Sequence, residues 1–274
     1  MTSRALREAF HREYLTFFER AERTRRWNVF DDIPWDELDN SPKHDRLALG
    51  AEMFCGVEMF LPDYLQANLS LMRGDYGRAW FAVNWGYEEA KHSLALWEYL
   101  RRSGQRTESQ LHDYADSVLA RQWRAPYESA RQMSVYAAVQ ELTTFVSYRM
   151  QRELAVRAGD RVLAETYRLI ARDEMAHSRF YRRMLALHLD DDRTGTLADL
   201  ALVVRTFRMP AHDLLPDYAR REDAMRVAGV DRGVFFTEVV LPLLGSLGLT
   251  RQDVYAVPLP PGARSAAAPP EGVR

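Results

Sequence analysis

The sequence predicts an all-α protein in which a four-helix bundle is surrounded by smaller helices. Glycine and proline are sparse in the 274-residue chain, which holds 14 Gly and 12 Pro. The long segments between them carry apolar residues at three- and four-residue spacing rather than in alternation, which indicates amphipathic helices. Four of these segments are about 25 to 33 residues long and have short connections, the pattern of a helical bundle.

The first third of the chain should contain two long helices separated by an irregular stretch. A helix is expected over residues 4–26, and Pro34 interrupts regular structure in the segment that follows it. The next helix is expected over residues 43–72 and ends near Gly74.

After it the pattern predicts three more long helices and several shorter ones, over residues 78–103, 108–122, 126–158, 160–189 and 194–247. Gly104 and Gly159 follow two of the long helices, as is typical of helix ends, and Pro126 suits a helix first turn. We expect residues 1–256 to form a single domain. The Pro/Ala-rich tail, residues 257–274, has little to bury and is expected to be disordered.

Composition excludes several classes of function. With 37 Lys+Arg against 39 Asp+Glu, the net charge of -2 gives no general attraction to nucleic acid or to an anionic membrane. The single cysteine, Cys55, excludes an intramolecular disulfide and any multi-cysteine metal site. No apolar run has the length of a membrane span or the form of a signal peptide, so a cytoplasmic protein is expected.

Two of the long helices carry the pattern Glu-x-x-His. Glu89 precedes His92, and Glu174 precedes His177. Residues three apart lie on the same face of a helix, so each pair can bind one metal ion. The pattern alone is common, and a third copy near the N-terminus, EAFH, is attributed to chance.

The other two long helices each carry a carboxylate within an apolar stretch, Glu58 and Glu141. A buried carboxylate without a partner is costly, so each should meet a cation or a hydrogen-bond donor. Glu58 precedes Glu89 by 31 residues and Glu141 precedes Glu174 by 33, so the chain presents two similar helix pairs.

This order of side chains is the ligand pattern of ferritin-like di-iron and di-manganese carboxylate proteins. Four carboxylates neutralise two divalent cations, and two imidazoles complete an N/O set that suits iron or manganese. The alternative is a bundle that holds two buried Glu/His pairs without metal. The predicted ligands are Glu58, Glu89, His92, Glu141, Glu174 and His177.

Residues beside these ligands are candidates for supporting roles. Asp173 directly precedes Glu174 and could accept the free ring N–H of the histidine across the bundle; for Glu88 a solvated position is an equal alternative. Thr143 and Thr144 lie within a helical turn of Glu141. A hydroxyl there either faces the metals or bonds its own backbone.

The sequence resembles the soluble acyl-acyl carrier protein desaturases, the family of the plant stearoyl enzymes. The resemblance extends from about Trp27 to Gly248, and its motifs are Trp27 with DDIP, Glu58 before Leu-Pro, EEAKH, QELTT, ARDEMAH and MPAH. It implies iron ligands at the six predicted positions and Thr144 near the oxygen site. It also implies that Trp27 and Asp173 link the His92 side to the surface for electron entry.

The resemblance implies an activity and partners as well. The family performs O2-dependent desaturation of an acyl chain carried by acyl carrier protein, with two ferrous ions as cofactor, or manganese as isolated. A ferredoxin-like donor and a homodimer are further implications. The stretch from Glu58 to Glu89 is shorter than in the plant enzymes, and Ser93 stands where glycine is expected. The apolar side chains that flank the ligands, Phe60 and Phe145 among them, are candidates for the acyl pocket.

Three other functions use a similar set of ligands. A ribonucleotide reductase radical subunit usually has a tyrosine one turn after the first histidine, where this chain has Leu96. Ferritin- or rubrerythrin-like chains are shorter and lack the Trp27 region. The alternative that stays open is a di-iron oxygenase or desaturase of a specialised pathway, acting on an unusual carrier-bound acid.

Overall fold

The computed structural model describes residues 2–40, 43–220, 230–260 and 263. The described residues form helices and no strand, in agreement with the predicted all-α class. The helices of the first half are α1 (Arg4–Arg20), η1 (Ala21–Arg25), η2 (Trp35–Asn40), α2 (Asp45–Glu58), α3 (Leu61–Met72), α4 (Tyr76–Arg102) and α5 (Glu108–Leu119). Those of the second half are α6 (Ala130–Ala158), α7 (Arg161–Asp191), α8 (Arg193–Thr206), η3 (His212–Leu214), α10 (Arg232–Val234), η4 (Phe235–Val240), α11 (Leu241–Ser246) and α12 (Arg251–Tyr255).

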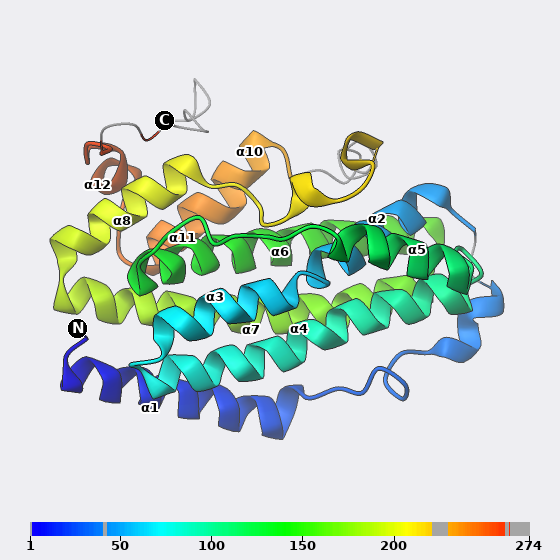
Figure 1. Cartoon of the computed structure of the whole chain (residues 1–274), viewed down its shortest axis with the longest axis horizontal. Helices are drawn as coiled ribbons and strands as arrows, with labels where there is room; N and C mark the ends of the chain where they lie inside the picture. The colour runs from blue at the N-terminus through cyan, green and yellow to red at the C-terminus, as the bar shows by residue number, and fades with distance from the viewer. Residues whose placement is uncertain (1, 41–42, 221–229, 261–262, 264–274) are drawn as a thin grey trace.

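The long helices lie side by side along the longest axis of the molecule (Figure 1). The pair α2/α3 acts as one discontinuous member of the bundle, and α4, α6 and α7 are the other three. Helix α1 packs along α4 and α7, whereas α8 and the C-terminal helices lie on the opposite side of the bundle (Figure 1). No described helix combines the length and the apolar character that a membrane crossing would need.

The helix predicted over residues 43–72 is in fact two helices, because of Pro62. Proline has no amide hydrogen, so it cannot donate to the carbonyl of Glu58, four residues earlier. Helix α2 therefore ends at Glu58, and α3 begins at Leu61 with proline in its first turn. The Tyr64 hydroxyl donates to the Val57 carbonyl at 3.0 Å and satisfies one of the backbone groups that the break exposes.

Two other boundaries differ from the prediction. The first α-helix ends at Arg20, and a wider π-helical turn, η1, carries the chain to Arg25. Helix α6 begins at Ala130 rather than near Pro126, because the Ser129 side chain caps it by accepting from the Gln132 amide at 3.0 Å. The predicted disordered tail, 257–274, lies mostly outside the described residues.

Helix α1 approaches α4 closely at one glycine. A Cβ atom on Gly77 would lie 2.7 Å from the Cα and the backbone nitrogen of His11. Only glycine allows this contact between the two backbones. The close approach fixes the position of α1, and η1 follows directly from that helix.

The apolar core has two parts. One cluster gathers around α3, α8 and the C-terminal helices, and the other around Trp27, α2 and the start of α7. Met59 and Phe145 pack against both clusters.

Candidate metal centre

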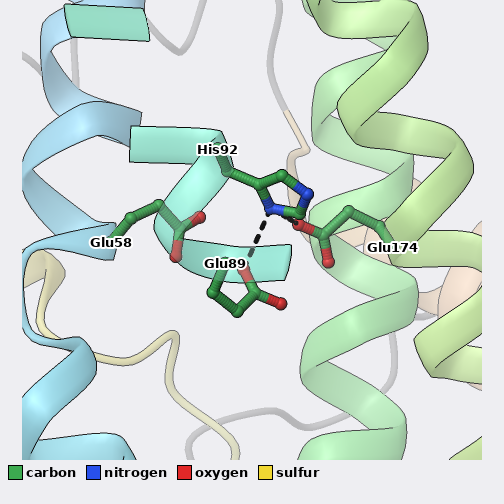
Figure 2. A group of neighbouring side chains, drawn as sticks. All are labelled: Glu58, Glu89, His92 and Glu174. Carbon is green, nitrogen blue, oxygen red and sulfur yellow. Dashed lines mark hydrogen bonds and ion pairs between the residues drawn. The ribbon is translucent and has the colours of Figure 1, made fainter. Parts of the chain in front are cut away.

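The six predicted ligands converge inside the bundle. Glu58 ends α2, Glu89 and His92 lie on α4, Glu141 lies on α6, and Glu174 and His177 lie on α7. All six are buried, and Glu58 has the largest exposed fraction at 7%. Figure 2 shows Glu58, Glu89, His92 and Glu174 pointing toward one another from three helices.

The ligand atoms form two overlapping groups. One holds Glu58, Glu89, His92 and Glu174, and the other holds Glu89, Glu141, Glu174 and His177. Within each group the atoms lie within 4.8 Å of one another. Because Glu89 and Glu174 belong to both groups, the arrangement suits two adjacent cations that share two carboxylates.

Both histidines turn the same ring nitrogen toward the carboxylates. The Nδ1 atom of His92 lies 3.0 Å from Glu89 Oε2 and 3.3 Å from Glu174 Oε1. The Nδ1 atom of His177 lies 3.1 Å from Glu89 Oε1 and 3.3 Å from Glu141 Oε2. The two imidazoles therefore offer equivalent donor atoms to the two cation positions.

The residues fit a metal pair, as their unsatisfied atoms indicate. Glu89 Oε1, Glu141 Oε2, both Glu174 oxygens and His177 Nδ1 are buried. Several of them lie within ion-pair distance of a neighbouring ligand atom, but none is aligned for a hydrogen bond with a described residue. A polar atom that is buried without a hydrogen-bond partner destabilises the folded state by the desolvation free energy of its group. Divalent cations between these atoms would satisfy them together, which two metal-free Glu/His pairs would not.

The pKa values reflect crowding of like charges. Burial, and then the neighbouring Glu89 charge, raise the pKa of Glu58 and of Glu174 well above their usual range. Burial also raises the pKa of Glu141. For Glu89, burial acts to raise the pKa, but His92 and His177 outweigh it and lower the pKa to about 2. Without cations, this group of carboxylates cannot all be ionised together.

Each histidine contacts an acid from the opposite helix through its other ring nitrogen. The Nε2 atom of His92 lies 3.4 Å from Asp173 Oδ2, and that of His177 lies 2.7 Å from Glu88 Oε2. Both acids are buried, so Glu88 does not occupy a solvated position. Such contacts fix the orientation of a metal-binding imidazole and increase its basicity.

The segment around η1 holds these two acids in place. Trp27 donates its indole N–H to Asp173 Oδ2 at 2.6 Å, and Arg25 donates to Asp173 Oδ1 at 2.5 Å. Arg25 also donates to Glu88 Oε1 at 2.8 Å. One buried guanidinium therefore joins the acids behind both histidines.

Thr143 and Thr144 both bond their own helix. The Thr144 hydroxyl donates to the Gln140 carbonyl at 3.0 Å, and that of Thr143 donates to the Val139 carbonyl at 2.7 Å. This is the backbone alternative that the sequence left open, and Thr144 beside the oxygen site stays a prediction.

Two residues that contact the cluster were expected only among the apolar side chains that flank the ligands, and a third residue, Arg25, which holds the outer acids, was missed at the level of sequence. Trp85 donates to Glu141 Oε1 at 3.0 Å, and Tyr148 donates to Glu58 Oε1 at 3.3 Å. A signal existed for both, because Trp85 lies four residues before Glu89 and Tyr148 seven after Glu141, on the ligand faces of their helices. Arg25 gave no such signal, since nothing local distinguishes it from its neighbouring arginines.

Comparison with known proteins decides the family. The sequence profile described as "Fatty acid desaturase" matches residues 58–249, most of the chain and all six clustered side chains. The chain belongs to this family. Among curated desaturases, the chain is 30% identical over 130 residues to stearoyl-[acyl-carrier-protein] 9-desaturase 2 of Arabidopsis thaliana, and 32% identical over 130 residues to 9-desaturase 6 of the same plant. Each match covers 47% of this chain but only 32% and 33% of the plant proteins, so the chain spans about a third of the length of these relatives.

Two solved structures share the fold of this chain. The structure of DesA2 of Mycobacterium tuberculosis H37Rv, a protein assigned as an acyl-ACP desaturase, matches with a TM-score of 0.65 and 20% identity, over 90% of this chain and 96% of that one. An R2-like ligand-binding oxidase with a Mn/Fe cofactor matches with a TM-score of 0.53 and 15% identity, over 88% of this chain and 93% of that one. At these identities the likeness establishes a ferritin-like helical fold.

Proposed function

We propose that this desaturase-family protein catalyses O2-dependent desaturation of an acyl chain bound to acyl carrier protein. The observation that carries the proposal is the set of orphaned buried carboxylate and imidazole atoms at two overlapping positions. Glu58, Glu89, His92, Glu141, Glu174 and His177 would hold two iron ions, or manganese as isolated. When bound, these metals would supply the activation of O2.

The residues of this chain have the remaining tasks. The bundle excludes water, since all six ligands are buried, and the outer acids Asp173 and Glu88 keep both imidazoles turned inward. Trp85 and Tyr148 fix the carboxylate oxygens that they contact. A preorganised site of this kind restricts where on a bound chain hydrogen can be removed.

The family resemblance supports the other elements of the proposal. The substrate carrier is acyl carrier protein, the electron donor is ferredoxin-like, and the enzyme is a cytoplasmic homodimer with one ferritin-like domain. Thr144, Asp173 and Trp27 are proposed to assist oxygen chemistry and electron entry.

One test uses Glu141→Ala and measures metal content and product together. The variant should bind fewer metal ions and lose activity, because one cation position loses its own carboxylate. The wild-type product should be an alkene two hydrogens lighter than the substrate by mass spectrometry. Fully active protein without metal would contradict the proposal.

A second candidate function is supported by the space beside the cluster. A cavity of about 20 Å³ is lined by Tyr64, Trp85, Trp123 and Tyr136, among others. That volume holds about one water molecule. Trp123 packs edge-on against Tyr64, with ring centroids 4.8 Å apart, and both rings line this small cavity. This favours a specialised oxygenase or desaturase of an unusual, shorter carrier-bound acid.

The two candidates differ in product and in substrate. Hydroxylation would give a product one oxygen atom heavier than the substrate. Turnover of a panel of acyl carrier proteins, loaded with chains of increasing length, would separate a long-chain desaturase from an enzyme of short acids. Trp123→Ala should extend the accepted length if this aromatic contact sets the limit.

A further inference from the structure

Three aromatic side chains, here called the aromatic path, lead from the metal cluster to the surface: Trp85, Tyr64 and Trp123. Trp85, on α4, donates its indole N–H to Glu141 Oε1 at 3.0 Å. Its ring centroid lies 6.5 Å from that of Tyr64 on α3, and the Tyr64 centroid lies 4.8 Å from that of Trp123, between α5 and α6. Trp85 and Tyr64 are 3% and 6% exposed, whereas Trp123 is partly exposed. The rings therefore connect Glu141 with solvent.

The two indoles and the phenol of the aromatic path suit different tasks. An indole can lose one electron and keep its proton for a time as a radical cation, whereas a phenol that loses an electron must release its hydroxyl proton. The Tyr64 hydroxyl donates to the Val57 carbonyl at 3.0 Å, and a carbonyl oxygen is not a base that can take this proton. Tyr64 therefore bridges the two indoles, which are the groups that can be oxidised.

Carboxylates at both ends of the aromatic path favour positive charge on its indoles. One is the acceptor of the Trp85 N–H, and the other is Asp63, which accepts from the backbone N–H of Trp123 at 2.8 Å. An opposite charge nearby stabilises the charged form of a buried group. The Trp27 indole also donates to a carboxylate, but the Lys91 ammonium lies 4.5 Å from its ring centroid and opposes a positive charge there. Oxidation is therefore favoured along the aromatic path over Trp27.

The other aromatic contact of the carboxylates ends inside the protein. Tyr148 donates to Glu58 Oε1 at 3.3 Å, and its ring centroid lies 5.7 Å from that of Tyr167. Both tyrosines are fully buried. Phe54, which stacks on Tyr148 with centroids 4.3 Å apart, is 2% exposed and is not readily oxidised. A reductant in solution can therefore reach Trp123 but not these rings.

We propose that the aromatic path is an electron relay that protects the metal centre when O2 is activated without substrate. The inference rests on the proposed function, because it needs O2 to be reduced at the cluster. Reduction of O2 to two waters takes four electrons and four protons. In desaturation, two electrons come from the donor, as two ferrous ions become ferric, and two come with two protons from the –CH2–CH2– group of the substrate.

Without substrate, the relay supplies the second pair of electrons. Each transfer takes one electron from Trp85, and an electron from Trp123 replaces it through Tyr64. The oxidised Trp123 indole then releases its N–H proton to water, since this residue is partly exposed. A soluble reductant such as ascorbate returns one electron and one proton to Trp123. Two such transfers, with four protons taken from solvent at the cluster, complete the reduction of O2.

The test follows the radical rather than turnover. Ferrous protein with ring-deuterated tryptophan is mixed with O2 without substrate, frozen rapidly and measured by electron paramagnetic resonance, which identifies an indole radical. Trp123→Phe keeps a ring but removes the oxidisable indole. Trp97→Phe is the matched control, because that partly exposed indole packs against His112 and is not part of the aromatic path. Tyr64→Phe keeps the bridging ring, whereas Tyr64→Leu removes it.

Wild type, Trp97→Phe and Tyr64→Phe should give an indole radical that ascorbate removes. Trp123→Phe and Tyr64→Leu should lose this ascorbate-sensitive radical with unchanged iron content, and peptide mapping after repeated exposure to O2 should find oxidised side chains beside the cluster. An ascorbate-sensitive radical of wild-type yield in Trp123→Phe would overturn the relay, as would the lack of an indole radical in wild type that binds iron and consumes O2. Wild type that binds no iron or consumes no O2 would contradict the proposed function itself, and the relay with it.

Discussion

At the scale of single residues, a buried hydrogen-bond network surrounds the cluster and links it to the N-terminal segment. Asp173 accepts from Trp27 and from Arg25 and faces His92. Lys91 lies over the Trp27 ring, its Nζ 4.5 Å from the ring centroid, and a cation so placed stabilises the electron-rich ring. The indole is therefore fixed between the buried Lys91 ammonium and the acid behind His92.

Trp27→Phe should slow reduction by a protein donor while the iron content stays near that of wild type. The substitution removes the indole N–H but leaves Arg25 to hold Asp173. Loss of a residue that hydrogen-bonds to the groups around a metal ligand typically lowers metal affinity or activity by about 10- to 100-fold. Stopped-flow measurement of donor oxidation gives the rate, and Trp35→Phe, whose indole bonds the Val29 carbonyl instead, is the matched control. Equal rates in both variants would remove Trp27 from the pathway.

Thr144→Val should leave iron bound but raise the O2 consumed for each alkene formed. Valine keeps the shape of threonine and removes the hydroxyl that now bonds the Gln140 carbonyl. Thr143→Val is the control, because that hydroxyl bonds its own helix in the same way. An oxygen electrode with product analysis measures the ratio. If both variants stay coupled, Thr144 has only a structural role.

At the scale of helices, the packing of α1 positions the residues that hold the outer acids. Gly77→Ala would place a methyl group against the His11 backbone, so α1 must shift away from α4. Overpacking of this kind costs about 1–3 kcal/mol of unfolding free energy. Denaturant unfolding measures the loss, and Gly74→Ala is the control because a Cβ there meets nothing within 4 Å. A loss no larger for Gly77→Ala than for Gly74→Ala would show that α1 accommodates the methyl group.

Features set by local spacing along the chain could be predicted from the sequence, whereas contacts between residues far apart in the chain could not. Periodicity predicted the long helices, and the spacing of Glu-x-x-His pairs with lone carboxylates predicted all six side chains that converge. It did not predict the break after Glu58, although Pro62 was visible, because the apolar period continues through it. Arg25 and its partner Asp173 are 148 residues apart, so no local pattern could pair them.

At the scale of the whole molecule, the charges of the metal-free cluster should make stability depend on pH. The raised pKa values of Glu58 and Glu174 mean that the folded state holds protons that the unfolded state releases above about pH 4.5. The pKa values of His92 and His177 are also raised, since their carboxylate neighbours outweigh burial. Stability of the metal-free protein should therefore fall as pH rises from 5.5 to 8.

Metal binding should have the opposite dependence, because cations displace these protons and bind more tightly as pH rises. The gap in Tm between iron-loaded and metal-free protein should thus widen from pH 5.5 to 8. The lowered pKa of Glu89 acts only below about pH 4.5, outside this window. Calorimetric scans at several pH values, with a zinc-loaded sample as a redox-inert control, measure the gap. A gap that stays constant would show that the ligands bind without releasing protons.

The break between α2 and α3 gives one ligand glutamate more freedom to move than the other three. Glu89, Glu141 and Glu174 project from the middle of continuous helices, whereas Glu58 is the last residue of its helix and lies next to a joint. A carboxylate at a joint can swing with little distortion of the scaffold, so a change in coordination number is absorbed most easily there. Crystal structures of the protein loaded with metals of different size should superpose at three glutamates and differ at the fourth, Glu58.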